Sequence, residues 1–227
     1  MYDVFFISYD ELDADINWQR LLDFAPGARR IHGVKGILNA HKAAAEQSNT
    51  AAFFVVDADA WVLDDWSFTS EWLEDIHIPY AGRSPANCTL VWRSRNPYNG
   101  LEYGYGGLKL MPKKDMLAAS DNIDIATSVC DCFMNIDAVG CETRFASDAW
   151  HAWRGAFREC TKLANAPVVQ TQWLDIWCST ATGEYSDNIL SGARLGRQYG
   201  EANRGNADAI RMVNNYDWLR STYEKSL

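Results

Sequence analysis

The amino-acid sequence predicts an α/β fold with a mixed, mainly parallel central sheet flanked by helices, followed by a helical C-terminal region. Three observations support this. The first 60 of the 227 residues alternate strand-like and helix-like segments, residues 53–56 form a short apolar run, and bulky side chains recur every three or four positions between 147 and 164. Strands that alternate with helices pair in parallel through right-handed crossovers. The N-terminal half-sheet is therefore of a kind that binds nucleotides.

Each N-terminal element follows from a local pattern. Short apolar runs rich in β-formers predict strands, and an Ala- and Lys-rich stretch predicts the longer helix. Pro26 and Gly27 end the first helix. The expected elements are, in order, strand 3–9, helix 17–24, strand 29–32, helix 37–47 and strand 52–57.

The chain beyond Trp66 is less regular. Residues 121–141 alternate too weakly to place, and the polar tail from Trp173 predicts helices interrupted by glycines. Ser147 is expected to cap the helix that follows it. No linker or repeat divides the chain, so we expect one domain over 1–227. The expected elements are strands over 76–79 and 89–92, a turn over 96–100, a glycine-aromatic loop over 103–107 that enters a strand, and helices over 113–119 and 147–164.

Composition argues against several classes of function. A net charge of −9 gives no overall attraction for nucleic acid or an anionic membrane. No apolar run approaches the ~20 residues that span a bilayer, and no basic region precedes the N-terminal apolar stretch, so we expect neither a membrane partner nor a signal peptide. The six scattered cysteines indicate reduced thiols in the cytoplasm. Cys130, Cys132 and Cys141 hint at zinc, but a one-residue gap is unlike the usual ligand spacing and favours ordinary thiols.

Two local runs are basic within this acidic chain, one between Arg83 and Lys114 and one between Arg194 and Arg211. Such runs either bind phosphates or form ordinary solvated faces. The sequence leaves both interpretations open.

Two carboxylates, Asp57 and Asp59, follow the central apolar run. Open α/β sheets bind ligands at the carboxyl ends of their strands, and a carboxylate there must be paired, solvated or bound to a cation. Alternation places both aspartates on one side of an extended chain. Such a pair suits Mg²⁺ or Mn²⁺ with open positions for substrate phosphates. The alternative is that the two residues simply end the strand and lead into a loop.

A second candidate site lies at the glycine-bounded turn over 32–36. Backbone N–H groups at the N-terminus of the following helix favour phosphate oxygens, and Lys35 adds a cation. Asn39 lies on the first turn of that helix. A plain turn and a solvated helix face are the alternative interpretation.

In combination, these segments resemble the GT-A class of nucleotide-sugar glycosyltransferases. The stretches ISYDE, HGVKGILNAHKAA, FFVVDADA and GYGGLKLMPK are similar to those of phage-encoded glycosyltransferases, including arabinosyltransferase-like enzymes that add a sugar to 5-hydroxymethylcytosine in phage DNA. The likeness covers residues 3–165. It implies a nucleotide-binding half over 1–66, an acceptor and metal half over 67–165, and a helical tail over 166–227.

The resemblance implies roles for individual residues. Asp59 would hold Mn²⁺ or Mg²⁺ on the diphosphate of a UDP-sugar, Asp57 would bind the metal or the ribose, and His151 would complete the metal shell. Tyr9 would stack on the uracil ring, although a half-buried tyrosine at a strand end is the alternative. The residues expected at the base and ribose are Ser8, Tyr9 and Asp10.

The loop over 103–107 is similar to the glycine-aromatic acceptor loop of galactosyltransferases, which ends in an acidic pair. Leu108 and Lys109 stand in that place here, so no catalytic base carries over. Asp148 is the candidate base for an acceptor hydroxyl, with a helix-start aspartate as its ordinary alternative. A turn between strands is the alternative for the loop. The residues expected to bind the acceptor are Tyr103, Tyr105, Gly106 and Gly107.

The resemblance therefore implies a metal-dependent hexosyl- or pentosyltransferase in the host cytoplasm. It would move a sugar from a UDP-sugar to a hydroxyl acceptor, 5-hydroxymethylcytosine in phage DNA. One alternative is a Mg²⁺-dependent nucleotidyltransferase or phosphohydrolase, since both use paired carboxylates. The other is a non-catalytic nucleotide- or sugar-binding module.

Overall fold

The computed structural model describes residues 1–69, 73, 76–80, 82–120, 125–166, 168 and 170–227. The chain divides into two compact units, and each is described by itself. The first comprises Met1–Arg95 and Glu102–Thr143, and the second comprises Asn96–Leu101 and Arg144–Leu227. The boundary at residue 144 does not coincide with a boundary that the sequence predicts.

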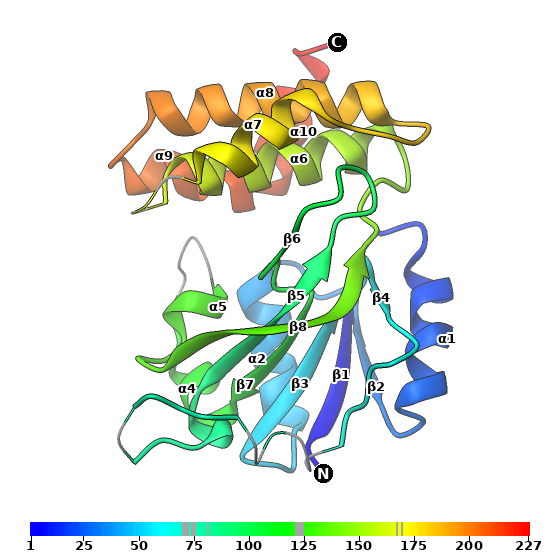
Figure 1. Cartoon of the computed structure of the whole chain (residues 1–227), viewed down its shortest axis with the longest axis vertical. Helices are drawn as coiled ribbons and strands as arrows, with labels where there is room; N and C mark the ends of the chain where they lie inside the picture. The colour runs from blue at the N-terminus through cyan, green and yellow to red at the C-terminus, as the bar shows by residue number, and fades with distance from the viewer. Residues whose placement is uncertain (70–72, 74–75, 81, 121–124, 167, 169) are drawn as a thin grey trace. The chain divides into compact units, whose positions relative to one another are not determined.

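The first unit is a mixed sheet flanked by helices (Figure 1). All five elements expected in the first 60 residues are present, and the first helix begins earlier than expected, at Ala14. The strands are β1 (Asp3–Ser8), β2 (Arg29–His32), β3 (Ala52–Asp57), β4 (Ala60–Val62), β5 (Thr89–Arg95), β6 (Glu102–Tyr103), β7 (Leu108–Pro112) and β8 (Phe133–Thr143). The helices are α1 (Ala14–Phe24), α2 (Ile37–Gln47), α4 (Lys113–Ala118) and α5 (Ile125–Ser128), with a 3-10 turn η1 (Pro85–Asn87).

The strand order is β2-β1-β3-β7-β5-β8-β4, and β6 pairs with β5. Pairing is parallel between β1 and its neighbours β2 and β3, and between β5 and β8. It is antiparallel for β7 with both neighbours, for β4 with β8 and for β6 with β5. The sheet is therefore mixed, as expected, but the expected predominance of parallel pairing is not confirmed. The strand expected over 76–79 is wrong, because those residues form no strand.

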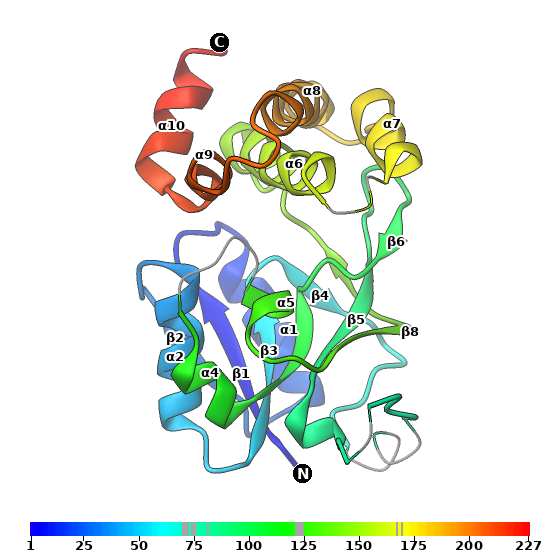
Figure 2. The same cartoon turned by 90° about the vertical axis from the view of Figure 1, so that its left-hand side faces the viewer.

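The apolar runs of β1 and β3 are continuous because helices cover both faces of the sheet (Figure 2). One core contains Phe6 and Phe54 with α1, which contributes Leu21. The other contains Phe5 and Val55 with the alanines of α2 and with residues of α4 and α5. Successive residues of β1 and β3 therefore point alternately into the two cores.

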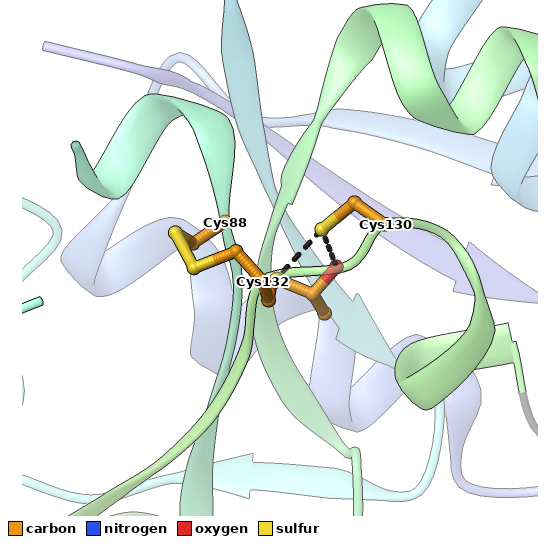
Figure 3. Close-up of a disulfide and its surroundings, with 4 residues drawn as sticks. Cys88, Cys130 and Cys132 are labelled. Carbon is orange, nitrogen blue, oxygen red and sulfur yellow. Dashed lines mark hydrogen bonds between the residues drawn. A yellow bond between two sulfur atoms is a disulfide. The ribbon is translucent and has the colours of Figure 1, made fainter. Parts of the chain in front are cut away.

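A disulfide joins Cys88, just before β5, to Cys132, just before β8 (Figure 3). Both cysteines are fully buried. The Cys130 thiol lies beside the disulfide and donates to the Cys132 carbonyl at 2.9 Å. The expectation that all six thiols are reduced is therefore wrong for this pair, and Cys132 is not available as a zinc ligand. Its partner lies 44 positions away, so sequence spacing gave no indication of the bond.

The second unit is helical. Its core is the aromatic stripe that the sequence predicts, with Trp150, Trp153 and Phe157 all buried. Asp148, not Ser147, caps α6, because its side chain accepts from the His151 N–H. Among the described residues, no helix of either unit is long and apolar enough to cross a membrane. The helices are α6 (Ala149–Ala164), α7 (Thr171–Ser179), α8 (Ser186–Ala202), α9 (Ala207–Arg211) and α10 (Tyr216–Glu224), with a 3-10 turn η2 (Met212–Asn214).

Candidate functional site

The carboxyl ends of three parallel strands meet at one edge of the sheet in the first unit. Ser8 at the end of β1 pairs in register with His32 at the end of β2, and Ile7 pairs with Asp57 at the end of β3. The segments that follow these strands therefore leave the sheet side by side. This edge is where an open α/β sheet places its ligands.

Asp57 is held by a buried lysine. Lys109 Nζ donates to Asp57 Oδ1 at 2.7 Å and to the Gly106 carbonyl at 2.5 Å. The Lys109 side chain is 4% exposed and that of Asp57 is 28% exposed. A buried ammonium needs such partners, and the register of Lys109 opposite Val55 places both charged side chains on the α2 face. Sequence analysis missed this pair, for which the signal was a lysine inside an apolar strand.

Asp59 lies half-buried in the turn between β3 and β4. Asn17 of α1, itself buried, donates to the Ala58 carbonyl at 2.7 Å and so fixes the turn between the two aspartates. Burial is the main cause that raises the pKa of the Cys141 thiol to about 12, and the charges of Asp59 and Asp57 act in the same direction, against the hydrogen bond with Ser94. Both carboxylates therefore lie within electrostatic reach of the same thiol.

The aspartate turn offers oxygen donors that fit Mg²⁺ or Mn²⁺. Lys109 binds Oδ1 of Asp57, and the candidate ligands are Oδ2 of Asp57 and the Asp59 carboxylate. Mg²⁺ often takes only one or two protein carboxylates and keeps waters and substrate phosphates as its other ligands. Within the described part of the chain, no group of three His, Cys, Asp or Glu side chains is arranged to hold a metal. Asp57 and Asp59 would therefore supply only part of the ligands of such a cation, with waters and substrate phosphates as the others.

The predicted nucleotide contacts differ in exposure. Ser8 is 2% exposed, and its hydroxyl accepts from Arg30 Nε at 2.9 Å and lies 2.9 Å from His32 Nδ1. The buried Ser8 hydroxyl therefore links the end of β1 to the side chains of β2. Tyr9 and Asp10, the next two residues, are exposed at the edge.

Lys35 lies exposed in the turn after β2, between two glycines with positive φ angles, Gly33 at 73° and Gly36 at 93°. Asn39 is also exposed, and its amide donates to the Lys35 carbonyl at 3.1 Å. This bond ties the turn to the first turn of α2. The structure thus keeps the Asn39 side chain beside the Lys35 backbone at the start of the helix.

The predicted acceptor loop is bonded directly to the aspartate segment. The Gly107 carbonyl accepts from the Asp57 N–H at 2.8 Å, and the Gly106 carbonyl accepts from Lys109. Tyr103 and Tyr105 stack with ring centroids 4.6 Å apart. Tyr103 is buried and Tyr105 is half-buried, so Tyr105 is the tyrosine with more surface to offer an acceptor.

Asp148 and His151 form a dyad in the second unit. Asp148 Oδ1 accepts from the His151 backbone N–H at 2.6 Å and lies 2.9 Å from His151 Nδ1. Its capping role is the ordinary alternative that the sequence offered. The same carboxylate orients the His151 ring, as carboxylates do for metal-binding histidines. Because the two aspartates of the turn belong to the first unit, the ligand set of Asp57, Asp59 and His151 stays a prediction.

The basic runs are largely engaged in contacts within the protein. In the first, Arg93 pairs with an aspartate, Arg95 pairs with two glutamates, and Lys109 is buried against Asp57. In the second, Arg197 binds Asp175 and Glu201. These pairs reduce the local positive charge that the sequence suggested for phosphate binding.

Comparison with known proteins gives no match to any family model, curated protein or solved structure.

Proposed function

We propose that this protein is a metal-dependent glycosyltransferase of the GT-A type that uses a UDP-sugar. One observation carries the proposal: an aspartate turn at the carboxyl ends of parallel strands is tied, through Lys109 and backbone bonds, to a glycine-aromatic loop. A donor diphosphate and an acceptor hydroxyl must meet in such an enzyme. The resemblance of the sequence segments supports the same assignment.

The reaction breaks a sugar–phosphate bond and expels a nucleoside diphosphate. A divalent cation held by Asp59 and by Oδ2 of Asp57 would neutralise charge on that leaving group. Lys109 holds Asp57 in one orientation, so the turn is preorganised for the cation. Tyr9 offers an aromatic face for the base, and Lys35 offers a cation for the phosphates.

The acceptor that we propose is a hydroxyl of 5-hydroxymethylcytosine in phage DNA, and the compartment is the host cytoplasm. Both follow from the resemblance. The target base would leave the duplex to reach the donor. The internal pairing of the basic runs implies that few lysines or arginines contact the DNA phosphates, so the affinity for DNA should be modest.

Thermal unfolding with a panel of UDP-sugars, each with and without Mn²⁺, tests the proposal. A ligand that binds the native state at 100 times its Kd adds about 2.7 kcal/mol of stability, which corresponds to a shift in Tm of several degrees. We expect a Mn²⁺-dependent shift with one donor. Asp59→Asn should abolish the shift, whereas the control Asp137→Asn, an exposed carboxylate of the same unit, should retain it.

An equal Mn²⁺-dependent shift in Asp59→Asn would contradict the metal site. Product analysis with hydroxymethylated DNA then separates the possible reactions. A transferase releases UDP and leaves a sugar on the base, whereas a nucleotidyltransferase releases pyrophosphate and a phosphohydrolase releases phosphate. A binding module shows the shift without turnover.

A further inference from the structure

His32 is an exposed histidine at the carboxyl end of β2, and the reaction described so far gives it no role. It pairs in register with Ser8 at the end of β1. The Gly33 N–H donates to the Ser8 carbonyl at 3.0 Å, so the chain leaves β2 directly beside the residue that precedes Tyr9. His32 therefore lies at the same edge of the sheet as the aromatic face that we assign to the nucleotide base.

Two hydrogen bonds of the Ser8 hydroxyl determine which nitrogen of the His32 ring carries its proton. Arg30 Nε lies 2.9 Å from Ser8 Oγ and can only donate, because a guanidinium has no acceptor. The other partner of the hydroxyl in the described part of the chain is His32 Nδ1, at 2.9 Å. Ser8 is 2% exposed, so a hydroxyl proton without an acceptor would be costly. His32 Nδ1 therefore accepts this proton, and the neutral ring carries its own proton on Nε2.

The arginine that begins this hydrogen-bond chain is itself held in place. Arg30 Nη1 donates to Asp15 Oδ1 of α1 at 2.6 Å, and the guanidinium carbon lies 5.6 Å from the centre of the Phe6 ring. The Arg30 side chain therefore directs the Ser8 hydroxyl, and the hydroxyl directs the His32 ring. Within the described residues, His32 Nε2 makes no hydrogen bond. The chain thus presents one oriented N–H donor at the edge of the sheet.

The position of β2 in the sheet indicates which part of a nucleotide this donor meets. β2 lies two strands away from β3, which ends at Asp57. Neighbouring strands are spaced at ~4.8 Å, so about 10 Å separates β2 from β3 across the sheet. A nucleoside diphosphate that binds a cation at the aspartate turn extends away from it through its ribose to its base. The base, and not the diphosphate, is therefore the part that reaches His32.

We propose that His32 recognises the base of the donor by donating from Nε2 to a carbonyl oxygen of uracil. This inference rests on the proposed use of a UDP-sugar. Ser8 and Arg30 are positioning residues, because they act through the His32 ring. Adenine has no carbonyl oxygen, so the oriented donor favours uracil over adenine.

NMR of the imidazole nitrogens in the intact chain tests the hydrogen-bond chain without any substrate. Neutral His32 should carry its proton on Nε2, whereas His41 should carry it on Nδ1, which donates to the Ile37 carbonyl. Ser8→Ala should move the His32 nitrogen shifts towards those of the exposed His77. Protonation of neutral wild-type His32 on Nδ1, or His32 shifts that Ser8→Ala leaves unchanged, would overturn the proposal.

Calorimetric titration with UDP or ADP in the presence of Mn²⁺ tests the contact with the base. His32→Phe keeps an aromatic ring but has no N–H, so its Kd for UDP should rise about fivefold, as expected for the loss of one hydrogen bond. Its Kd for ADP, which has the same ribose and diphosphate, should stay unchanged. His32→Gln keeps an N–H donor and should recover most of the affinity for UDP.

Equal losses of affinity for UDP and ADP in His32→Phe would overturn the proposal, because a contact with ribose or phosphate affects both nucleotides. An unchanged Kd for UDP in His32→Phe would also overturn it, while binding of UDP to the wild type would leave the proposed function intact. Absence of UDP binding to the wild type would instead overturn the proposed function, and this inference with it.

Discussion

Lys109 binds one oxygen of Asp57, so Asp57 is a poor candidate for a metal ligand that uses both oxygens. The same contact makes Asp57 a good candidate for a ligand that is held in one orientation. The Lys109 ammonium sits 2.7 Å from one oxygen of Asp57 and is almost wholly excluded from solvent. A buried charge pair is not by itself stabilising, but the loss of one partner leaves the other uncompensated. The pair therefore restricts the Asp57 carboxylate to one orientation.

Replacement of Lys109 by methionine should lower the free energy of unfolding by about 3 kcal/mol, because Asp57 loses its partner inside the protein. Asp57→Asn in the same background should recover part of that loss. Urea denaturation of the wild type, the two single variants and the double variant gives the coupling energy directly. Strictly additive effects would show that the pair contributes no interaction energy.

At this scale, the sequence identified the strand end but not its partners. The run into Asp57 and Asp59 predicted the end of β3, because burial on two faces produces a continuous apolar segment. Lys109 lies 52 positions from Asp57, and only the antiparallel insertion of β7 beside β3 brings the two together. No local pattern encodes that register.

At the scale of elements, the close approach of α6 and α8 is the most specific feature of the second unit. Gly192, Gly196 and Gly200 recur every four residues on the face of α8 that meets α6. A Cβ atom built on Gly196 would lie 2.2 Å from the Phe157 carbonyl oxygen. In addition, the Thr161 hydroxyl donates to the Gly196 carbonyl at 3.0 Å.

Gly196→Ala should therefore lower the free energy of unfolding by about 3 kcal/mol, since overpacking forces two backbones apart. The higher helix propensity of alanine works in the opposite direction by only about 1 kcal/mol. Gly27→Ala is the control, because a Cβ there meets no atom within 4 Å, and its effect should be small. Guanidinium denaturation followed by circular dichroism measures both, and a neutral Gly196→Ala would disprove the contact.

The sequence predicted these helices but misinterpreted their glycines as interruptions. The spacing of four was the available signal, since it places small residues on one helix face. β8 was missed for a different reason. Residues 133–139 of β8 are half-buried or exposed, and the pairing of β8 with β5 shifts register on either side of Arg93. Buried and exposed side chains therefore do not alternate steadily along this strand.

For the whole molecule, acid sensitivity follows from one histidine within the core of the first unit. His41 on α2 is fully buried, and its Nδ1 donates to the Ile37 carbonyl at 2.7 Å. Its Nε2 is buried and has no hydrogen-bond partner in the described part of the chain. Burial, and then the charge of Lys109, lower the pKa of His41 from 6.5 to about 3.

The native state therefore favours neutral His41, and between pH 6.5 and about 3 the unfolded chain binds one more proton. The contribution to stability is complete above pH 6.5 and declines as the pH falls through this window, by up to about 1.4 kcal/mol per pH unit. His41→Leu replaces the titrating group with an apolar side chain of similar size, so the unfolding free energy of the variant should depend less on pH between 6 and 4. Urea denaturation at pH 4.5, 5.5 and 7.5 compares the two proteins, with His77→Leu, a change at a more exposed site, as the control. Parallel pH profiles for wild type and His41→Leu would mean that His41 takes up its proton without unfolding the core.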